Sequence, residues 1–180
     1  MIYLLDADVL IDANRYYYPI GRVPEFWDWL VDLGKKGLVK IPIEIYEEIK
    51  AGKVKEDEEK GKIDHLPKWA REQSTVDALL FGESVDESLM ARILDEGYAT
   101  DLTDEEVIKI GRDPFLIAYA LKNPTERCIV TTELSKPTAT RGNRHLPDVC
   151  NGFGISTCHT FGSNGFIQAL DFKTSWNHVN

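Results

Sequence analysis

Two carboxylates follow apolar runs that have the length and composition of buried strands. Asp6 ends the run that begins at Met1, and Glu133 comes directly after the segment Ile129–Thr132. In open α/β sheets, ligands bind at the carboxyl ends of the strands. Because a buried carboxylate is costly without a cationic partner, we expect both acids to face a metal or phosphate site at one sheet edge. The alternatives are a plain strand-to-helix turn after Met1–Leu5 and an ordinary loop position for Glu133.

Two further carboxylates belong to predicted helices. Glu48 falls within the apolar stripe of a helix expected from Pro42 to about Ala51, where an acid is unusual. Its alternative role is a buried salt bridge to a lysine. Asp113 precedes Pro114, and this pair is typical of a helix N-cap. A helix N-terminus also lies at the edge of the sheet where strands end, so Asp113 can cap and face a site at once.

These four acids together have no structural purpose, since neighbouring carboxylates raise one another's pKa and destabilise the fold. They suit Mg²⁺ or Mn²⁺, which take oxygen ligands, activate water and stabilise the in-line displacement at a phosphodiester. We expect Asp6, Asp113 and Glu133 to be metal ligands, and Glu48 to bind the ion or orient the attacking water. All four are predicted catalytic residues.

Several polar side chains are candidates for substrate contact. The hydroxyl of Thr131 or Thr132 can hold the attacking water or a phosphate oxygen. Arg141 and Arg144, in a predicted loop beyond the last of the acids, can steer a phosphate backbone. Arg15 precedes three tyrosines that can stack on bases, although packing is the commoner role of such tyrosines.

Two other aspartates have simpler expected roles. Asp8 is expected to cap a helix that starts near Val9 and to orient the turn after Asp6. Asp148 follows Pro147 and is a weaker fifth candidate, since an aspartate after proline is most often part of a turn.

The elements that must position these residues alternate along the chain. Strands are expected at Met1–Leu5, Leu38–Ile41, Arg127–Thr131 and Gly154–His159, with helices between them. This order predicts an α/β domain, a three-layer α/β/α fold around a central parallel sheet of about four or five strands. A helical insertion is expected at about 53–100, where it would serve as a lid or clamp, and Thr103 to Glu106 form a capping box that starts the next helix.

Composition limits the class of protein. The 180 residues are expected to form a single domain, residues 1–180. The net charge of −9 weakens the case for nucleic-acid binding but does not exclude it, because a bound metal ion can invert the local charge. No apolar stretch approaches the roughly 20 residues that span a bilayer, and the N-terminus lacks a signal-peptide pattern. Three cysteines fit reduced thiols in a cytoplasm, not a disulfide framework.

Four segments, in order, resemble the motifs of PIN-domain ribonucleases. They are Leu4–Ile11, then Glu48-Ile49 with Gly52, then Asp113–Ala120, and finally Val130–Glu133. Ala7 and Asp8 replace the family's common Thr and Asn, and Glu133 stands where Asp is more usual. The resemblance covers most of the chain, with a longer region at about 53–100 than in the smallest members.

This resemblance implies a PIN-like fold and a Mg²⁺- or Mn²⁺-dependent endoribonuclease. Such proteins are often the toxin of a toxin–antitoxin pair, inhibited by a small antitoxin protein and frequently present as a homodimer. RNA, an antitoxin and a second copy of the chain are therefore the expected partners, in the cytoplasm and without a membrane.

Two alternatives remain open. A PIN-like domain that has lost catalysis would be a protein- or RNA-binding module, and Glu133 in place of Asp is the feature that favours it. Asp6-Ala7-Asp8 also resembles the start of haloacid-dehalogenase phosphatases, in which Asp6 would be the nucleophile. That family places Thr two positions beyond the second Asp, where this chain has Leu10, and it would leave Glu48 unused.

Overall fold

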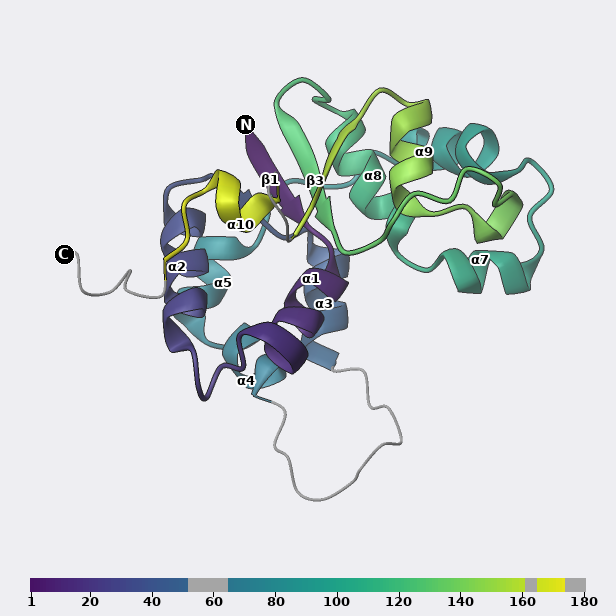
Figure 1. Cartoon of the computed structure of the whole chain (residues 1–180). Helices are drawn as coiled ribbons and strands as arrows, with labels where there is room; N and C mark the ends of the chain where they lie inside the picture. The colour runs from purple at the N-terminus through teal and green to yellow at the C-terminus, as the bar shows by residue number, and fades with distance from the viewer. Residues whose placement is uncertain (52–64, 161–164, 174–180) are drawn as a thin grey trace, which may run out of the picture.

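A four-stranded parallel sheet forms the centre of the chain (Figure 1). The computed structural model describes residues 1–51, 65–160 and 165–173. The strands lie in the order β2-β1-β3-β4, with bounds β1 Ile2–Leu5, β2 Val39–Lys40, β3 Arg127–Thr131 and β4 Ser156–His159. All three pairings are parallel, and Leu5 of β1 lies opposite Val130 of β3. The carboxyl ends of the strands therefore meet at one edge.

One face of the sheet is covered by aromatic residues of two helices, α2 (Pro24–Lys35) and α10 (Phe166–Ala169). The ring of Tyr3 on β1 packs against Phe166 with 5.4 Å between centroids, and Phe166 packs against Trp29 at 5.6 Å. Large rings bury much apolar area and prefer such edge-on or tilted contacts. This aromatic layer fixes β1 from one side.

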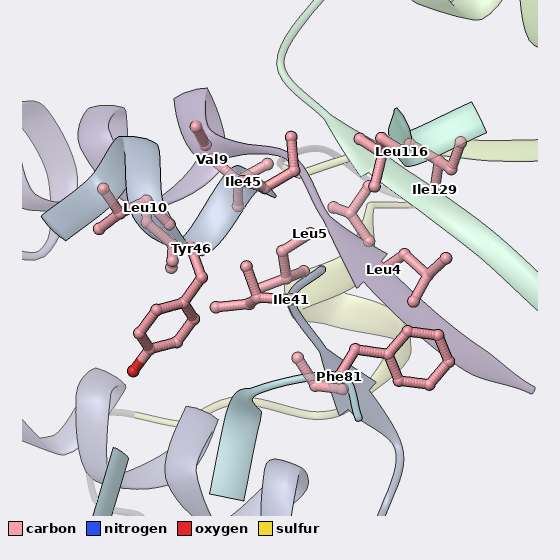
Figure 2. Close-up of a cluster of buried hydrophobic side chains, with 14 of the residues drawn as sticks. Leu4, Leu5, Val9, Leu10, Ile41, Ile45, Tyr46, Phe81, Leu116 and Ile129 are labelled. Carbon is pink, nitrogen blue, oxygen red and sulfur yellow. The ribbon is translucent and has the colours of Figure 1, made fainter. Parts of the chain in front are cut away.

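The opposite face is covered by α8 (Asp113–Leu121), with α9 (Leu146–Gly152) beside it. Leu4 points away from Tyr3 because successive strand residues alternate between faces. Figure 2 shows Leu4 in one buried cluster with Ile129 of β3 and Leu116 of α8. Each of these three side chains is fully buried. The sheet thus lies between two helical layers, which confirms the predicted three-layer α/β/α class.

The other helices connect and surround these layers. Figure 1 shows α1 (Ala7–Asp12) and α3 (Ile43–Ala51) near the end of the sheet where β1 stops. The remaining elements are π-helix η1 (Ala13–Tyr17), α4 (Leu66–Ala70), α5 (Gln73–Leu79), α6 (Glu87–Arg92), π-helix η2 (Ile93–Tyr98), α7 (Asp104–Ile110) and 3-10 helix η3 (Arg141–Asn143). The part of the expected insertion from 53 to 64 lies outside the described residues, and residues 66–98 are mostly helical.

Some local expectations are confirmed and others are wrong. The capping box at Thr103 and Glu106 is present and starts α7. Asp8 does not cap the first helix: that helix begins at Ala7, Asp6 holds the N-cap position, and Asp8 lies in the first turn. The extended backbone of Asp6, at ψ 152°, ends the strand and enters the helix in one residue. This short turn leaves no room for the expected later start.

Candidate active site

Asp6 is a buried carboxylate at the carboxyl end of β1, with 9% of its surface exposed. Its backbone N–H donates to the carbonyl of Val130 at 3.0 Å, which continues the pairing with β3 one residue past the strand. Its carboxylate accepts a hydrogen bond of 3.0 Å from the hydroxyl of Thr131. Burial raises the pKa of Asp6 to about 7, and the charges of Asp8 and Glu133 add to this rise while Thr131 opposes it.

Asp113 is the second buried acid, at the first position of α8. Burial raises its pKa well above the ordinary value, and the next cause is the charge of Asp6, followed by those of Glu133, Asp8 and Glu48. These effects require the carboxylates to lie near one another in a poorly solvated region. The charges of the other three predicted acids, Asp6, Glu48 and Glu133, therefore act on Asp113, and Asp8 adds a fifth acid. We call these five residues the acid cluster.

The position of Asp113 is fixed by bonds at both ends of α8. At the start, the guanidinium of Arg112 donates to the backbone carbonyl of Glu44 on α3. At the end, the buried Arg127 donates to the carbonyl of Tyr119 at 2.6 Å. Arg127 also forms an ion pair with Glu83. The helix that carries one acid is thus tied to the helix that carries Glu48 and to the strand that ends at Thr131.

Glu133 has a structural bond as well as a place in the acid cluster. One of its carboxylate oxygens accepts from the backbone N–H of Leu146 at 2.9 Å, at the start of α9. Its own N–H donates to the hydroxyl of Thr131 at 3.1 Å. A single hydroxyl therefore bridges Asp6 and the backbone of Glu133. The long side chain of glutamate lets this residue reach the start of α9.

The chemistry of the acid cluster fits a hard divalent cation, because it offers carboxylate oxygens in a region where they repel one another. Asp6 and Asp113 are the most strongly affected, so they gain most from a bound positive charge. Within residues 1–51, 65–160 and 165–173, no three His, Cys, Asp or Glu side chains are already gathered as a metal-binding group. Mg²⁺ commonly binds through one or two carboxylates and keeps several waters, so it does not depend on a group of three.

A comparison with family models gives one match, which covers residues 3–173 and is described as a domain of unknown function, DUF4411. The chain belongs to the DUF4411 family. No curated protein and no solved structure matches it. The acid cluster of this DUF4411 chain lies within the matched range, between residues 6 and 133. No helix in the described part of the chain is long and apolar enough to cross a membrane.

The predicted substrate-binding residues of this DUF4411 chain have different surroundings. Thr131 is 1% exposed and holds Asp6, so its position is that of an orienting residue. Thr132 is half-buried, and its carbonyl is 3.1 Å from a ring nitrogen of His159. Arg15 lies on exposed η1, with its guanidinium 5.7 Å from the centroid of the Tyr16 ring.

The two loop arginines make bonds within the chain. Arg141 forms ion pairs of 2.6 Å with Asp101 and 2.9 Å with Glu106 of α7. Arg144 donates to the backbone carbonyls of Gly97 and Asp148. Contact of either arginine with a substrate stays a prediction. In the structure, both arginines connect the segment around η3 to neighbouring helices.

Tyr98, the last residue of η2, was not among the residues predicted from the sequence. Its side chain is buried, and the charge of Asp113 is the largest electrostatic contribution to a raised pKa, followed by Cys150 and Glu133. The acid cluster therefore has a neutral hydroxyl group near it. A π-helical turn breaks the 3.6-residue periodicity by which buried faces are recognised.

Proposed function

We propose that this chain is a metal-dependent endoribonuclease that hydrolyses RNA phosphodiester bonds. The observation that carries the proposal is the pair of buried carboxylates Asp6 and Asp113, whose pKa values are both raised by burial and by neighbouring carboxylates: Asp8 and Glu133 act on Asp6, and Asp6 acts on Asp113. Such groups are unfavourable in the fold on their own, and perturbed acids of this kind concentrate at functional sites. Their place at the carboxyl edge of a parallel sheet is where α/β proteins bind ligands.

The residues of the acid cluster would have different roles in the reaction. Asp6 and Asp113 would hold the cation, and Glu133 would supply a further oxygen while it caps α9. The hydroxyl of Thr131 keeps the carboxylate of Asp6 in place. Glu48, half-buried on α3, would accept a proton from or orient the attacking water. A bound Mg²⁺ or Mn²⁺ ion would lower the pKa of that water and would stabilise the charge that develops on the phosphate oxygens.

The order of the four PIN-like motifs supports RNA as the substrate, since all four contribute to the acid cluster. On the same resemblance we propose that the chain acts in the cytoplasm as the toxin of a toxin–antitoxin pair. A small antitoxin and a second copy of the chain are its proposed protein partners. The free thiols of Cys128, Cys150 and Cys158 support a reducing compartment.

The test is cleavage of single-stranded and structured RNA by the purified chain with Mg²⁺ or Mn²⁺, with and without EDTA. We expect Asp6→Asn to lower the cleavage rate by at least about a hundredfold, because the neutral amide no longer holds the cation. The matched control is Asp86→Asn, because Asp86 caps the exposed start of α6 by accepting from the N–H groups of Ser88 and Leu89. Cleavage that survives Asp6→Asn would exclude the metal site.

The same assay separates the alternatives. A wild-type chain that binds RNA or a protein partner but cleaves nothing would be a binding module. A chain that hydrolyses phosphate monoesters and leaves RNA intact would instead match the phosphatase resemblance of Asp6-Ala7-Asp8.

A further inference from the structure

The three consecutive tyrosines after Arg15 have two different environments. Tyr18 is half-buried, and its ring lies parallel to the ring of Phe26, with 4.4 Å between centroids and 13° between planes. Tyr16 and Tyr17 are 63% and 55% exposed. Packing is therefore the role of Tyr18, whereas the other two rings present much of their surface to solvent.

The two exposed rings and the arginine form one surface. The rings of Tyr16 and Tyr17 meet edge to face, with 6.3 Å between centroids and 77° between planes. The guanidinium of Arg15 lies 5.7 Å from the centroid of the Tyr16 ring, within the range of a cation–π contact. We call these three residues the tyrosine platform. It offers an aromatic face and a positive charge side by side.

The backbone around the platform is fixed by hydrogen bonds on both sides. The side chain of Asn14 accepts from the N–H of Ile20 at 3.2 Å, and the N–H of Tyr18 donates to the carbonyl of Ala13 at 2.6 Å. The indole N–H of Trp27 on α2 donates to the carbonyl of Tyr18 at 2.7 Å. Because the turn is already ordered, a ligand that binds the rings does not have to order their backbone.

The platform is joined to the acid cluster by one helical segment. Asp6 directly precedes α1, and η1 continues from α1 to Tyr17. Figure 1 shows α1 leading away from the end of β1. Ten residues at about 1.5 Å each separate Asp6 from Tyr16 by roughly 15 Å. That distance is the length of about four stacked nucleotides at 3.4 Å each, and fewer nucleotides when a strand is extended.

We propose that the tyrosine platform binds a single-stranded part of the same RNA whose phosphodiester bond is cleaved at the acid cluster. A base would stack on Tyr16, and Arg15 would contact a phosphate. The inference rests on the proposed ribonuclease function and adds a second contact with the substrate. Only unpaired bases expose their faces to aromatic side chains, so the platform would favour single-stranded RNA. A positive charge there also attracts a strand that the carboxylates repel.

Tyr16→Leu tests the stacking contact because it keeps an apolar side chain and removes the flat ring. The probe is a fluorescent single-stranded RNA of about ten nucleotides, and its affinity is measured by anisotropy in Ca²⁺. We expect the affinity to fall about tenfold to a hundredfold, the usual effect of losing one stacked base. The matched control is Tyr16→Phe, which keeps the ring and should bind like the wild type. Both variants should unfold at the wild-type urea concentration, because the side chain is exposed.

Substrate length gives a second measurement. A dinucleotide is too short to reach from the acid cluster to the platform, so Tyr16→Leu should cleave it in Mg²⁺ as fast as the wild type. The longer RNA should be cleaved by this variant with a lower kcat/KM. Arg15→Gln should reduce the slope of log affinity against log salt concentration by about 0.7, the effect of losing one contact with a single-stranded phosphate backbone.

Each outcome has a separate meaning. Unchanged RNA affinity in Tyr16→Leu would overturn the inference and leave the proposed ribonuclease intact. An equal loss of affinity in Tyr16→Phe would show that the ring face is not the contact, which also overturns it. A Tyr16→Leu chain that keeps its RNA affinity but no longer dimerises in sedimentation would assign the platform to a second copy of the chain instead. A wild type that binds RNA through Tyr16 but cleaves none would refute the ribonuclease proposal and leave the platform standing.

Discussion

The raised pKa of Asp6 makes a quantitative prediction about stability. In the unfolded chain this carboxyl ionises at 3.8, and in the folded chain it holds its proton up to about pH 7. The folded state therefore binds the proton more tightly, and stability falls as pH rises between these two values. At about 1.4 kcal/mol for each pH unit, the loss is about 4 kcal/mol above pH 7. Asp6→Asn has the same shape and no charge to bury.

Urea unfolding at pH 4 and at pH 8 measures this effect. We expect Asp6→Asn to be more stable than the wild type at pH 8, by up to about 4 kcal/mol, and equal to it near pH 4. Adding Mg²⁺ at pH 8 should narrow the difference, because a cation that binds only the folded wild type stabilises it. The control, Asp86→Asn, removes a carboxylate whose pKa is lowered by hydrogen bonds from Ser88 and Leu89, so it should not increase stability at pH 8.

Two results would contradict the raised pKa of Asp6. A variant Asp6→Asn that is less stable than the wild type at pH 8 would show that the ionised carboxylate stabilises the fold. A difference that does not change with pH would show that Asp6 titrates normally and is well solvated.

Three other substitutions have expected outcomes that can be measured. Thr131→Val removes the donor to Asp6, and we expect a loss of about 1–3 kcal/mol in unfolding free energy together with slower RNA cleavage. Gly97→Ala places a methyl group against Val149 of α9 and against Phe153, and should lower the unfolding free energy by about 1–3 kcal/mol, as urea denaturation can show. Arg127→Met removes the buried guanidinium that bonds to Glu83 and to the carbonyl of Tyr119, while Lys122 still pairs with Glu83. It should lower the unfolding free energy by about 1–3 kcal/mol, as chemical denaturation can show.

Three of the four strands were predictable because each is a short apolar run, and the limits of the run mark the ends of the strand. β3 matches the expected range Arg127–Thr131. β1 begins one residue later than expected, and β2 is one residue shorter at each end. α9 was not predicted as a helix, although Pro147 stands in its first turn. Its start depends on a hydrogen bond from Leu146 to Glu133, thirteen positions earlier, which a local pattern cannot show.

The site was predictable where an acid interrupts an apolar pattern and unpredictable where its role depends on distant partners. Asp6, Glu48 and Asp113 each stand out against apolar neighbours, and the structure places them in one cluster. Nothing in the sequence around Arg141 indicates that its guanidinium pairs with two acids 35 and 40 positions away. Tyr98 looks like any core aromatic in the sequence, and it differs from Tyr46 in that its hydroxyl has no hydrogen-bond partner among the described residues.

The pairing of β1 with β3 determines when the site can exist during synthesis. Asp6 and Thr131 are separated by 125 positions, and their hydrogen bond needs both strands in place. A ribosome that adds about 5–20 residues per second leaves the emerging chain for on the order of ten seconds with Asp6 made and its partners still missing. Contacts this far apart also form slowly. A nascent or truncated chain that stops before β3 therefore carries Asp6, Asp8, Glu48 and Asp113, but it lacks Glu133 and the Thr131 hydroxyl that holds Asp6.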